Sequence, residues 1–419
     1  MKQPLKIAIV VGTFPVVSQT FIVNQINTLI DSGHRVSLYA YKKGEIDSLH
    51  ESLKKHDLLK EVIYLRKNTP KNLLRFFEFF VWTFKNLFKI RWRRYFKTIN
   101  VFKYGKKAYL LSHFFAIKWS LIQDDFDIIH IHFAHNARLI SYLKSVELFS
   151  SKTKLVTTLH GYDLVPSKSE FYKDAYSIVF EQTNMITVNS LYLKKQLQIL
   201  QPQLNTINVL PVGLDTTFFS KTQPKIRSNF FDIVFCGRLI ELKGPEIAID
   251  IVDVLLKKGH TKIRLHMIGD GPLYKHLDEI IKDRSLQNHV FLKGAQTQEI
   301  IKKELEEADV LIMPGIPDPK SGQEEAQGLV IQEAQAMELP VVVSDVGGMK
   351  YGLIPDESGF VVKANDINAF VDALELLILD ETLGLQMGKK GMQFVKEKFD
   401  NIVLTQRLLE LYNQAIKTI

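Results

Sequence analysis

Short apolar runs alternate with helix-like segments twice along this chain, and this alternation constrains the fold more than any other feature. The runs begin near residues 6, 35, 127, 154, 185 and 207 in the first half, and near 232, 263, 289, 310, 340 and 359 in the second. They are rich in β-branched residues, which is typical of buried strands in a parallel sheet. The chain is therefore predicted to be α/β, with two Rossmann-like doubly wound domains facing a cleft.

The division between the two halves is expected in a polar stretch at 220–225. The first domain would cover 1–219 and the second 226–395, and residues 396–419 would form a helix that packs back on the first domain. Apolar spacing predicts one continuous helix over 383–419. A single cysteine, Cys236, excludes an internal disulfide. Without a signal peptide or a long apolar span, a cytoplasmic protein is expected.

The positive charge is concentrated in residues 66–107. The net charge of the whole chain is +8, whereas this segment alone holds 13 Lys or Arg, one acidic residue and 12 aromatic residues. A basic, aromatic-rich helical segment is typical of a protein that lies on an anionic membrane. The alternative is an inserted helix whose aromatic side chains fill the first domain. A nucleic-acid partner is not expected, because no known binding module accompanies the charge.

The second half carries a pattern suited to a diphosphate. Gly237 and Arg238 directly follow a predicted strand, and Lys243-Gly244 precedes a helix that begins near Pro245. Two cations beside a helix N-terminus can bind phosphate groups. The alternative is a solvated turn with incidental basic residues. A dinucleotide is disfavoured, because the glycine fingerprint for its pyrophosphate is incomplete in both halves.

Two glutamates, Glu325 and Glu333, flank a segment that opens a helix, and Gly328, Leu329 and Val330 lie between them. Carboxylates can accept hydrogen bonds from the vicinal hydroxyls of a sugar. The pair follows the strand at 310–313, so it should lie at the same sheet edge as the two cations.

Three histidines in the first half offer a second candidate site. His130 and His132 share one face of a predicted strand, and His135 follows it. A metal site is one interpretation, but no carboxylate or cysteine completes it nearby. The favoured interpretation has His132 in the cleft and His130 in the core. His160 either lies in the cleft or pairs with Asp163 for structure alone.

An ordered set of motifs runs from Gly12 to Phe360. In the first half these are Gly12-Thr13-Phe14-Pro15 with Ser18, His132-Phe133, His160-Gly161-Tyr162-Asp163 and Pro211-Val212-Gly213-Leu214-Asp215. In the second half they are Gly237-Arg238-Leu239 with Lys243-Gly244, Gly269-Asp270-Gly271-Pro272-Leu273, Glu325 with Glu333-Ala334, Val343-Ser344-Asp345-Val346-Gly347-Gly348 and Ser358-Gly359-Phe360. The set resembles family 4 glycosyltransferases of the exopolysaccharide-building type, which are retaining GT-B enzymes that use nucleotide sugars.

The resemblance implies a role for each matching residue. Arg238 and Lys243 would neutralise the diphosphate, Glu333 would hold the ribose, and Glu325 would contact the sugar hydroxyls near the amides of Gly328, Leu329 and Val330. The glycines Gly12 and Gly237 would let the backbone approach the donor, and His160 would face the reacting carbon. The acceptor side of the cleft would involve Phe14, Ser18, His132 and Asp163, and Asp163 would help position the loop that carries His160.

Two positions depart from the family pattern. Glu338 stands where glycine is usual, and Met349-Lys350 replaces a Pro-Glu pair. An Asp125-Phe126-Asp127 sequence spells a metal-binding pattern of another glycosyltransferase fold, but it precedes its strand and is not expected to bind metal.

The function implied is transfer of a hexose from a UDP- or GDP-sugar to a growing, lipid-linked glycan at the inner face of the cell membrane, without a cofactor or metal. The alternatives are a nucleotide-sugar epimerase or hydrolase of the same fold, and a catalytically silent sugar-binding protein.

Overall fold

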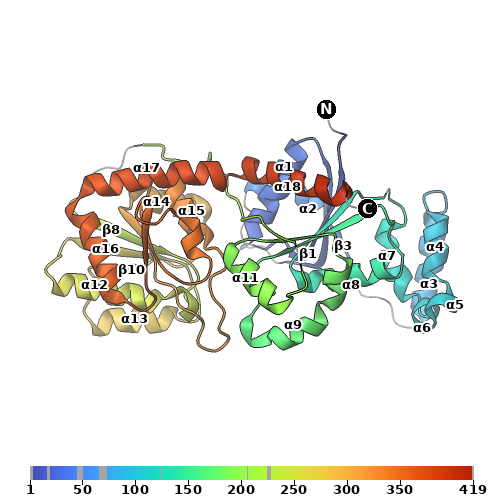
Figure 1. Cartoon of the computed structure of the whole chain (residues 1–419), viewed down its shortest axis with the longest axis horizontal. Helices are drawn as coiled ribbons and strands as arrows, with labels where there is room; N and C mark the ends of the chain where they lie inside the picture. The colour runs from blue at the N-terminus through green and yellow to red at the C-terminus, as the bar shows by residue number, and fades with distance from the viewer. Residues whose placement is uncertain are drawn as a thin grey trace.

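The computed structural model describes residues 3–16, 19–44, 51–65, 73–123, 125–204, 206–223 and 228–417. Two parallel sheets lie side by side along the length of the molecule, each covered by helices on both faces (Figure 1). None of the described helices combines the length and apolarity needed to cross a bilayer.

The first sheet has the strand order β3-β2-β1-β4-β5-β6-β7. Its strands are β1 (Lys6–Phe14), β2 (Arg35–Lys43), β3 (Ile63–Tyr64), β4 (Ile128–His132), β5 (Lys154–Leu159), β6 (Met185–Val188) and β7 (Ile207–Val209). The helices that cover it are α1 (Thr20–Asp31), α2 (Leu58–Glu61), α8 (Ala134–Ser145), α9 (Ser169–Ala175), α10 (Ser177–Gln182) and α11 (Leu191–Leu200). The central strands are fully buried because apolar helix faces pack on both sides of them.

The second sheet has the order β10-β9-β8-β11-β12-β13. Its strands are β8 (Phe231–Cys236), β9 (Ile263–Ile268), β10 (Val290–Leu292), β11 (Val310–Met313), β12 (Val341–Ser344) and β13 (Gly359–Val362). The helices are α12 (Pro245–Lys257), α13 (Tyr274–Asp283), α14 (Gln298–Glu307), α15 (Leu329–Ala336), α16 (Ile367–Leu379) and α17 (Glu381–Lys398). The strand order reverses between β1 and β4 in one sheet and between β8 and β11 in the other, which is where such sheets bind ligands.

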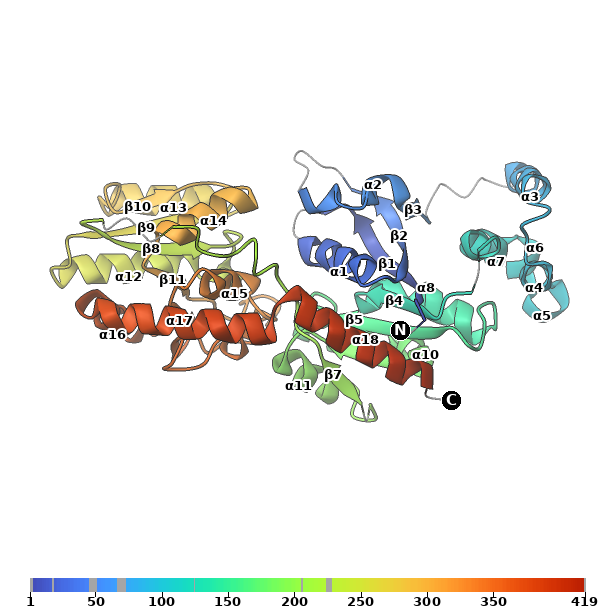
Figure 2. The ribbon, with the colours of Figure 1, turned by 90° about the horizontal axis from the view of Figure 1, so that it is seen from above.

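Residues 73–117, which include the described part of the basic segment, form a separate helical insertion between β3 and β4. Its helices are α3 (Leu73–Lys85), α4 (Trp92–Thr98), α5 (Val101–Tyr104), α6 (Lys106–Tyr109) and α7 (Ser112–Ile117). They lie at one end of the molecule, away from the second sheet (Figure 2). The insertion has a small apolar core of its own, in which Phe79, Tyr95 and Phe114 are buried. Some of its aromatic residues therefore fill a core, and others remain for the surface.

The chain crosses between the domains twice, and the two crossings are bonded to each other. Leu214 donates its N–H to the carbonyl of Phe399, and Asn401 donates to the carbonyl of Leu214. After the second crossing, α18 (Asn401–Lys417) buries Leu408 and Tyr412 in the core of the first domain. Figure 1 shows α17 and α18 running along one side of both domains.

Two boundaries differ from the sequence prediction. The chain enters the second domain before residue 220, because Phe219 already packs in that domain's core and Thr222 bonds to Glu306 on α14. Residues 224–225 of the expected linker lie outside the described residues. The terminal helix is two helices, because the chain turns at Phe399 and Asp400 where it crosses back. Helical spacing on each side of that turn concealed the break.

Candidate active site

The two sheet edges meet at a cleft, and the strongest electrostatic feature there is an ion pair. Lys243, from the turn after β8, contacts the carboxylate of Glu325, from the long loop between β11 and α15, and each side chain is 16% exposed. Glu325 also accepts the N–H of Gly328 at 3.1 Å, at the start of α15. Burial would raise the pKa of Glu325, but the Lys243 ammonium and these backbone donors hold that pKa below its usual value. The glutamate is therefore charged at neutral pH.

Arg238 reaches across the cleft from the second domain. Its guanidinium hydrogen-bonds the hydroxyl of Tyr162 and lies 5.6 Å from the centre of the tyrosine ring. Both side chains are exposed, so this contact joins the domains without being sealed from solvent. Gly237 and Lys243 are also close: a Cβ at Gly237 would lie 3.7 Å from the Lys243 side chain. Gly237, Arg238 and Lys243 thus form one basic corner of the cleft.

Glu333 lies on α15 and lines a pocket of about 400 Å³ between the domains. The pocket is bounded by α1 on one side and by the first crossing on the other, through residues such as Asn24 and Asp215. Glu333 is 9% exposed, and its carboxylate has no hydrogen bond or ion pair with any other described residue. Burial raises its pKa to about 7. Such a carboxyl group is costly to keep charged, which is typical of a ligand-binding residue.

Asp163 fixes the loop that carries His160. The buried carboxylate accepts the N–H groups of His160 and Gly161 with one oxygen, at 3.0 and 3.1 Å, and that of Ala134 at 2.8 Å with the other. Ala134 begins α8 after β4, so Asp163 ties together the loops that follow β4 and β5. Asp163 thus positions the His160 loop, as the resemblance implies, but it does so from behind the cleft surface and does not line the acceptor side itself.

His160 belongs to a row of three histidines, of which His130 and His132 are buried and His160 is half-buried. Its Nε2 lies 3.0 Å from Nδ1 of His132, the His132 ring stacks on His130, and His130 bonds to Tyr412 of α18 at 2.6 Å. Burial lowers the pKa of His132 to about 3 and holds those of His130 and His160 well below the usual value. His160 and His132 each keep one buried ring nitrogen without a partner among the described residues.

The row of histidines corrects the expectation for His132. It is 1% exposed, and its Nδ1 lies 3.0 Å from Nε2 of His160, so His132 is buried behind His160 and does not itself line the cleft among the described residues. His135 is exposed and does not join the row, so the three-histidine metal interpretation fails. No group of three potential metal ligands occurs anywhere in the described part of the chain.

The loop between β11 and α15 brings the domains together. The side chain of Gln327 donates to the carbonyl of Val212 and accepts its N–H, both at 2.8 Å. A Cβ on Gly161 would lie 2.8 Å from the Cβ of Ala326, so only glycine allows this approach without movement. The cleft residues of the two domains therefore face each other at close range.

Phe14 does not lie in the cleft. The first strand continues through residue 14 rather than ending at Gly12, and Phe14 is buried in the core of the first domain. Gly12 lies at the cleft end of β1, where a Cβ would meet the side-chain amide of Asn136 at 3.1 Å. Ser18 lies outside the described residues.

The Asp125 and Asp127 carboxylates have structural partners at the opposite edge of the sheet. Asp125 pairs with Arg91 and Arg94, and Asp127 accepts the N–H of Lys6 at 2.8 Å. These contacts hold the insertion and the start of β4 in place.

The two departures from the family pattern leave the cleft loops in place. Gly348 donates its N–H to the carbonyl of Glu325, while Lys350 pairs with Asp345 at the surface, 2.7 Å away. Glu338 follows the end of α15 and lies 4.0 Å from Lys221. Sequence reasoning missed Gln327 and Tyr412, and no local pattern marks either of them.

Two family models match this chain and together span most of it. Residues 18–218 match "Glycosyltransferase Family 4", and residues 217–394 match "Glycosyl transferases group 1". WcaL of Escherichia coli K12, named for colanic acid biosynthesis, is 25% identical over 411 residues, which cover 97% of this chain and 99% of WcaL. The amylovoran biosynthesis glycosyltransferase AmsK of Erwinia amylovora is also 25% identical, over 413 residues and the same shares of both chains.

Solved structures share the fold. HepE of Anabaena, solved with UDP and glucose, superposes with a TM-score of 0.72 at 16% identity, over 98% of this chain and 100% of HepE. A glycosyltransferase from Rickettsia africae has a TM-score of 0.70 at 20% identity, over the whole of both chains.

Proposed function

This chain belongs to the family 4 glycosyltransferases of the GT-B fold, and from that premise we propose that it is a retaining hexosyltransferase of surface polysaccharide biosynthesis. The proposed donor is a UDP- or GDP-hexose, and the proposed acceptor is a growing, lipid-linked glycan. The names of WcaL and AmsK support the pathway class, and the UDP and glucose bound to HepE support a nucleotide-sugar donor.

The observation that carries this proposal is the basic corner beside the Lys243–Glu325 pair. Breaking a sugar–phosphate bond leaves negative charge on the diphosphate and positive charge on the anomeric carbon. Arg238 and Lys243 would stabilise the departing diphosphate, together with the N–H groups at the start of α15. Glu325, released from Lys243 by the diphosphate, would accept hydroxyls of the hexose. Cations that stabilise the leaving group in this way make a metal unnecessary.

The remaining cleft residues would place the two substrates. Glu333, in its pocket beside the first crossing, would accept the ribose hydroxyls. The loop that carries His160 comes close to the second domain, since a Cβ on Gly161 would lie 2.8 Å from that of Ala326. From there the His160 ring would lie beside the reacting carbon, and the acceptor would approach the same face from which the diphosphate leaves.

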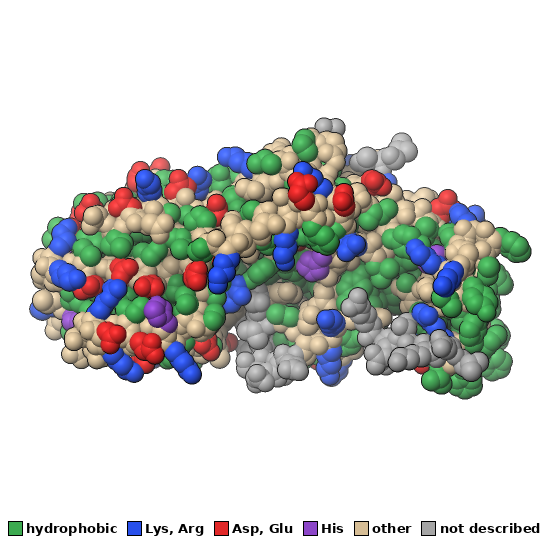
Figure 3. Space-filling model, turned by 90° about the horizontal axis from the view of Figure 1, so that it is seen from below, with side chains coloured by type: hydrophobic (Ala, Val, Ile, Leu, Met, Phe, Trp, Pro, Cys, Tyr) green, Lys and Arg blue, Asp and Glu red, His purple; other side chains and the backbone are tan. Residues whose placement is uncertain are grey.

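The proposal includes contact with the inner face of the cell membrane. Five apolar side chains on and just after α3 share one outward face and are between 63% and 99% exposed: Leu74, Phe77, Phe80, Phe84 and Phe88. Figure 3 shows hydrophobic side chains gathered at the end of the molecule that the insertion forms, with Lys and Arg beside them. Exposed aromatics beside cations favour the interface of an anionic bilayer.

The test is a transfer assay with UDP- and GDP-hexoses and a lipid-linked glycan acceptor. Nucleotide release should depend on the acceptor, and NMR of the product should show the anomeric configuration of the donor. Free sugar released at a rate independent of the acceptor would favour an epimerase or hydrolase. An inverted product would contradict the retaining mechanism.

A further inference from the structure

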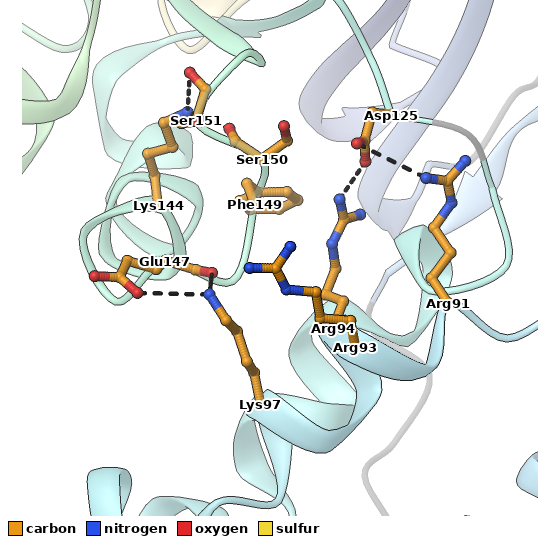
Figure 4. A pocket seen from close by; sticks show the side chains of 10 residues that line it. All are labelled: Arg91, Arg93, Arg94, Lys97, Asp125, Lys144, Glu147, Phe149, Ser150 and Ser151. Atoms are coloured by element: carbon orange, nitrogen blue, oxygen red, sulfur yellow. Dashed lines mark hydrogen bonds and ion pairs between the residues drawn. The ribbon is translucent and has the colours of Figure 1, made fainter.

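A large basic pocket lies where the insertion joins the first domain (Figure 4). Its volume is about 620 Å³. The lining residues are Arg91, Arg93, Arg94, Lys97, Asp125, Lys144, Glu147, Phe149, Ser150 and Ser151. Five of these side chains are cationic and two are anionic, which gives the lining a net charge of +3.

The cations differ in how fully they are already paired. Arg94 is fixed by Asp125, and Lys97 shares Glu147 with Lys103. Arg93, in contrast, has no hydrogen bond or ion pair with another described residue, and Figure 4 shows its guanidinium pointing into the pocket. The lining therefore offers an unpaired guanidinium, which suits a phosphate oxygen.

Lys144 lies on the other wall and has no carboxylate partner among the residues that the structure describes. Its ammonium donates to the carbonyls of Ser150 and Thr153, both at 2.6 Å. Burial, together with the charge of Lys154, lowers the pKa of Lys144 to about 8. The ammonium also donates to the carbonyl of Ser151 at 3.4 Å, so Lys144 adds positive charge to this wall, and a direct contact to a bound anion would come from Arg93.

One helix connects the pocket with the exposed apolar surface. Along α4, Arg93 and Lys97 are one turn apart and line the pocket, whereas Trp92 and Phe96 are one turn apart on the adjacent stripe and are exposed. A ligand with an anionic head and apolar tails would satisfy both stripes at once. A soluble anion would leave the aromatic stripe uncovered.

The pocket is separate from the transfer site. Asp125 precedes β4, whereas His132 ends it, so the pocket and the cleft lie at opposite edges of the sheet. A strand of this length spans roughly 17 Å. The phosphate that this pocket takes is therefore not the diphosphate of the donor or of an acceptor in the cleft.

We infer that this pocket binds the phosphate head group of an anionic phospholipid while the aromatic surface of α3 and α4 contacts its acyl chains. The inference rests on the proposed membrane contact and deepens it, because it turns a general attraction into a site for single lipid molecules. Such a site would fix the orientation of the protein on the bilayer.

The test uses short-chain phosphatidylglycerol below its critical micelle concentration, with binding followed by NMR titration of the full chain. A site gives saturable binding to the monomeric lipid, whereas a diffuse charge does not. The pocket variant is Arg93→Gln with Lys97→Gln. Its matched control is Lys85→Gln with Lys89→Gln, which removes the same charge from exposed positions of the insertion outside the pocket.

The pocket variant should weaken lipid binding at least tenfold, and the control should change it less than threefold. Equal losses in both variants, or no saturable binding by the wild type, would overturn the inference.

Inorganic phosphate is the second probe: binding as tight as that of the lipid would assign the pocket to a soluble anion instead. Binding of UDP and GDP, measured on the same variants, should not change. If vesicle binding persists in the pocket variant but is lost in Phe84→Ser with Phe88→Ser, the membrane contact stands without the pocket.

Discussion

Lys243 and Glu325 lie in different loops, 82 positions apart in sequence, and meet in an ion pair where the two domains face each other. The pair keeps a buried glutamate charged and holds a lysine at the place where the proposed diphosphate would bind. Lys243 therefore sets the charge state of Glu325, and the ion pair fixes the position of both side chains.

The first prediction concerns this coupling. In Lys243→Met the carboxylate loses its cation while its burial remains, so the pKa of Glu325 should rise above its usual value. We expect the sugar donor to bind only when Glu325 is charged. As the pH is lowered, donor binding by the variant should therefore be lost at a higher pH than donor binding by the wild type. Calorimetric titrations of a UDP- or GDP-hexose between pH 5 and 8 measure this shift. If the variant and the wild type lose donor binding at the same pH, the coupling between Lys243 and Glu325 is contradicted.

The second prediction concerns Glu333. Its pKa is about 7 in the folded protein and near 4.5 when unfolded, so charging it costs stability as pH rises from about 4.5 through 7. Glu333→Gln should therefore stabilise the protein by about 2–3 kcal/mol at pH 8 and by clearly less at pH 5.5. Thermal unfolding at the two pH values measures the difference. An equal gain at both would show that the carboxyl group titrates normally, and a loss of donor binding should accompany either result.

The third prediction treats His132 as a positioning residue for His160. His132→Leu removes the partner of His160 Nε2, whereas His132→Asn keeps a polar group near the position of Nδ1. The leucine variant should lower kcat about tenfold, because a tenfold change corresponds to the free energy of roughly one buried hydrogen bond. The KM for the donor should change little. The asparagine variant should recover most of the loss. Equal kcat values for the two variants would contradict a role in orientation.

The fourth prediction tests the close approach of the domains. Gly161→Ala would place a Cβ 2.8 Å from that of Ala326, so the variant should separate the cleft faces and lower kcat while UDP or GDP binding to the second domain persists. Gly259→Ala is the matched control, because Gly259 also has positive φ but nothing within 4 Å of an added Cβ. A similar loss of kcat in both variants would mean that backbone strain, not the domain contact, is responsible.

The sequence predicts most of the two sheets because their strands are short β-branched runs that can be recognised locally. It misses β3, a two-residue strand at the edge of the first sheet, because two residues are too few to show a pattern. The positions of Arg238, Lys243 and Glu325 near one another follow from the rule that strand ends share a sheet edge. Their chemical roles stay predictions. The prediction for Phe14 is wrong because a glycine within β1 resembles the end of a strand, although pairing with β2 carries the strand past it.

Contacts between distant loops could not be predicted. Gln327 bonds to Val212 and Tyr412 bonds to His130 only because the chain crosses twice between the domains, and no local spacing encodes such a crossing. The buried position of His132 also depends on a contact between distant residues, because the loop after β5 folds over the end of β4. The break at Phe399 has no glycine or proline to mark it.

The central claim is that a nucleotide diphosphate binds at the basic corner of the cleft. Calorimetric titration of UDP and GDP with the wild type, Lys243→Met and the surface control Lys275→Met tests it most directly. We predict that one of the two nucleotides binds, that Lys243→Met weakens it about ten- to a hundredfold through loss of a charge-assisted hydrogen bond, and that the control leaves it unchanged. Unchanged affinity in Lys243→Met, or no binding of either nucleotide at millimolar concentration, would contradict the claim.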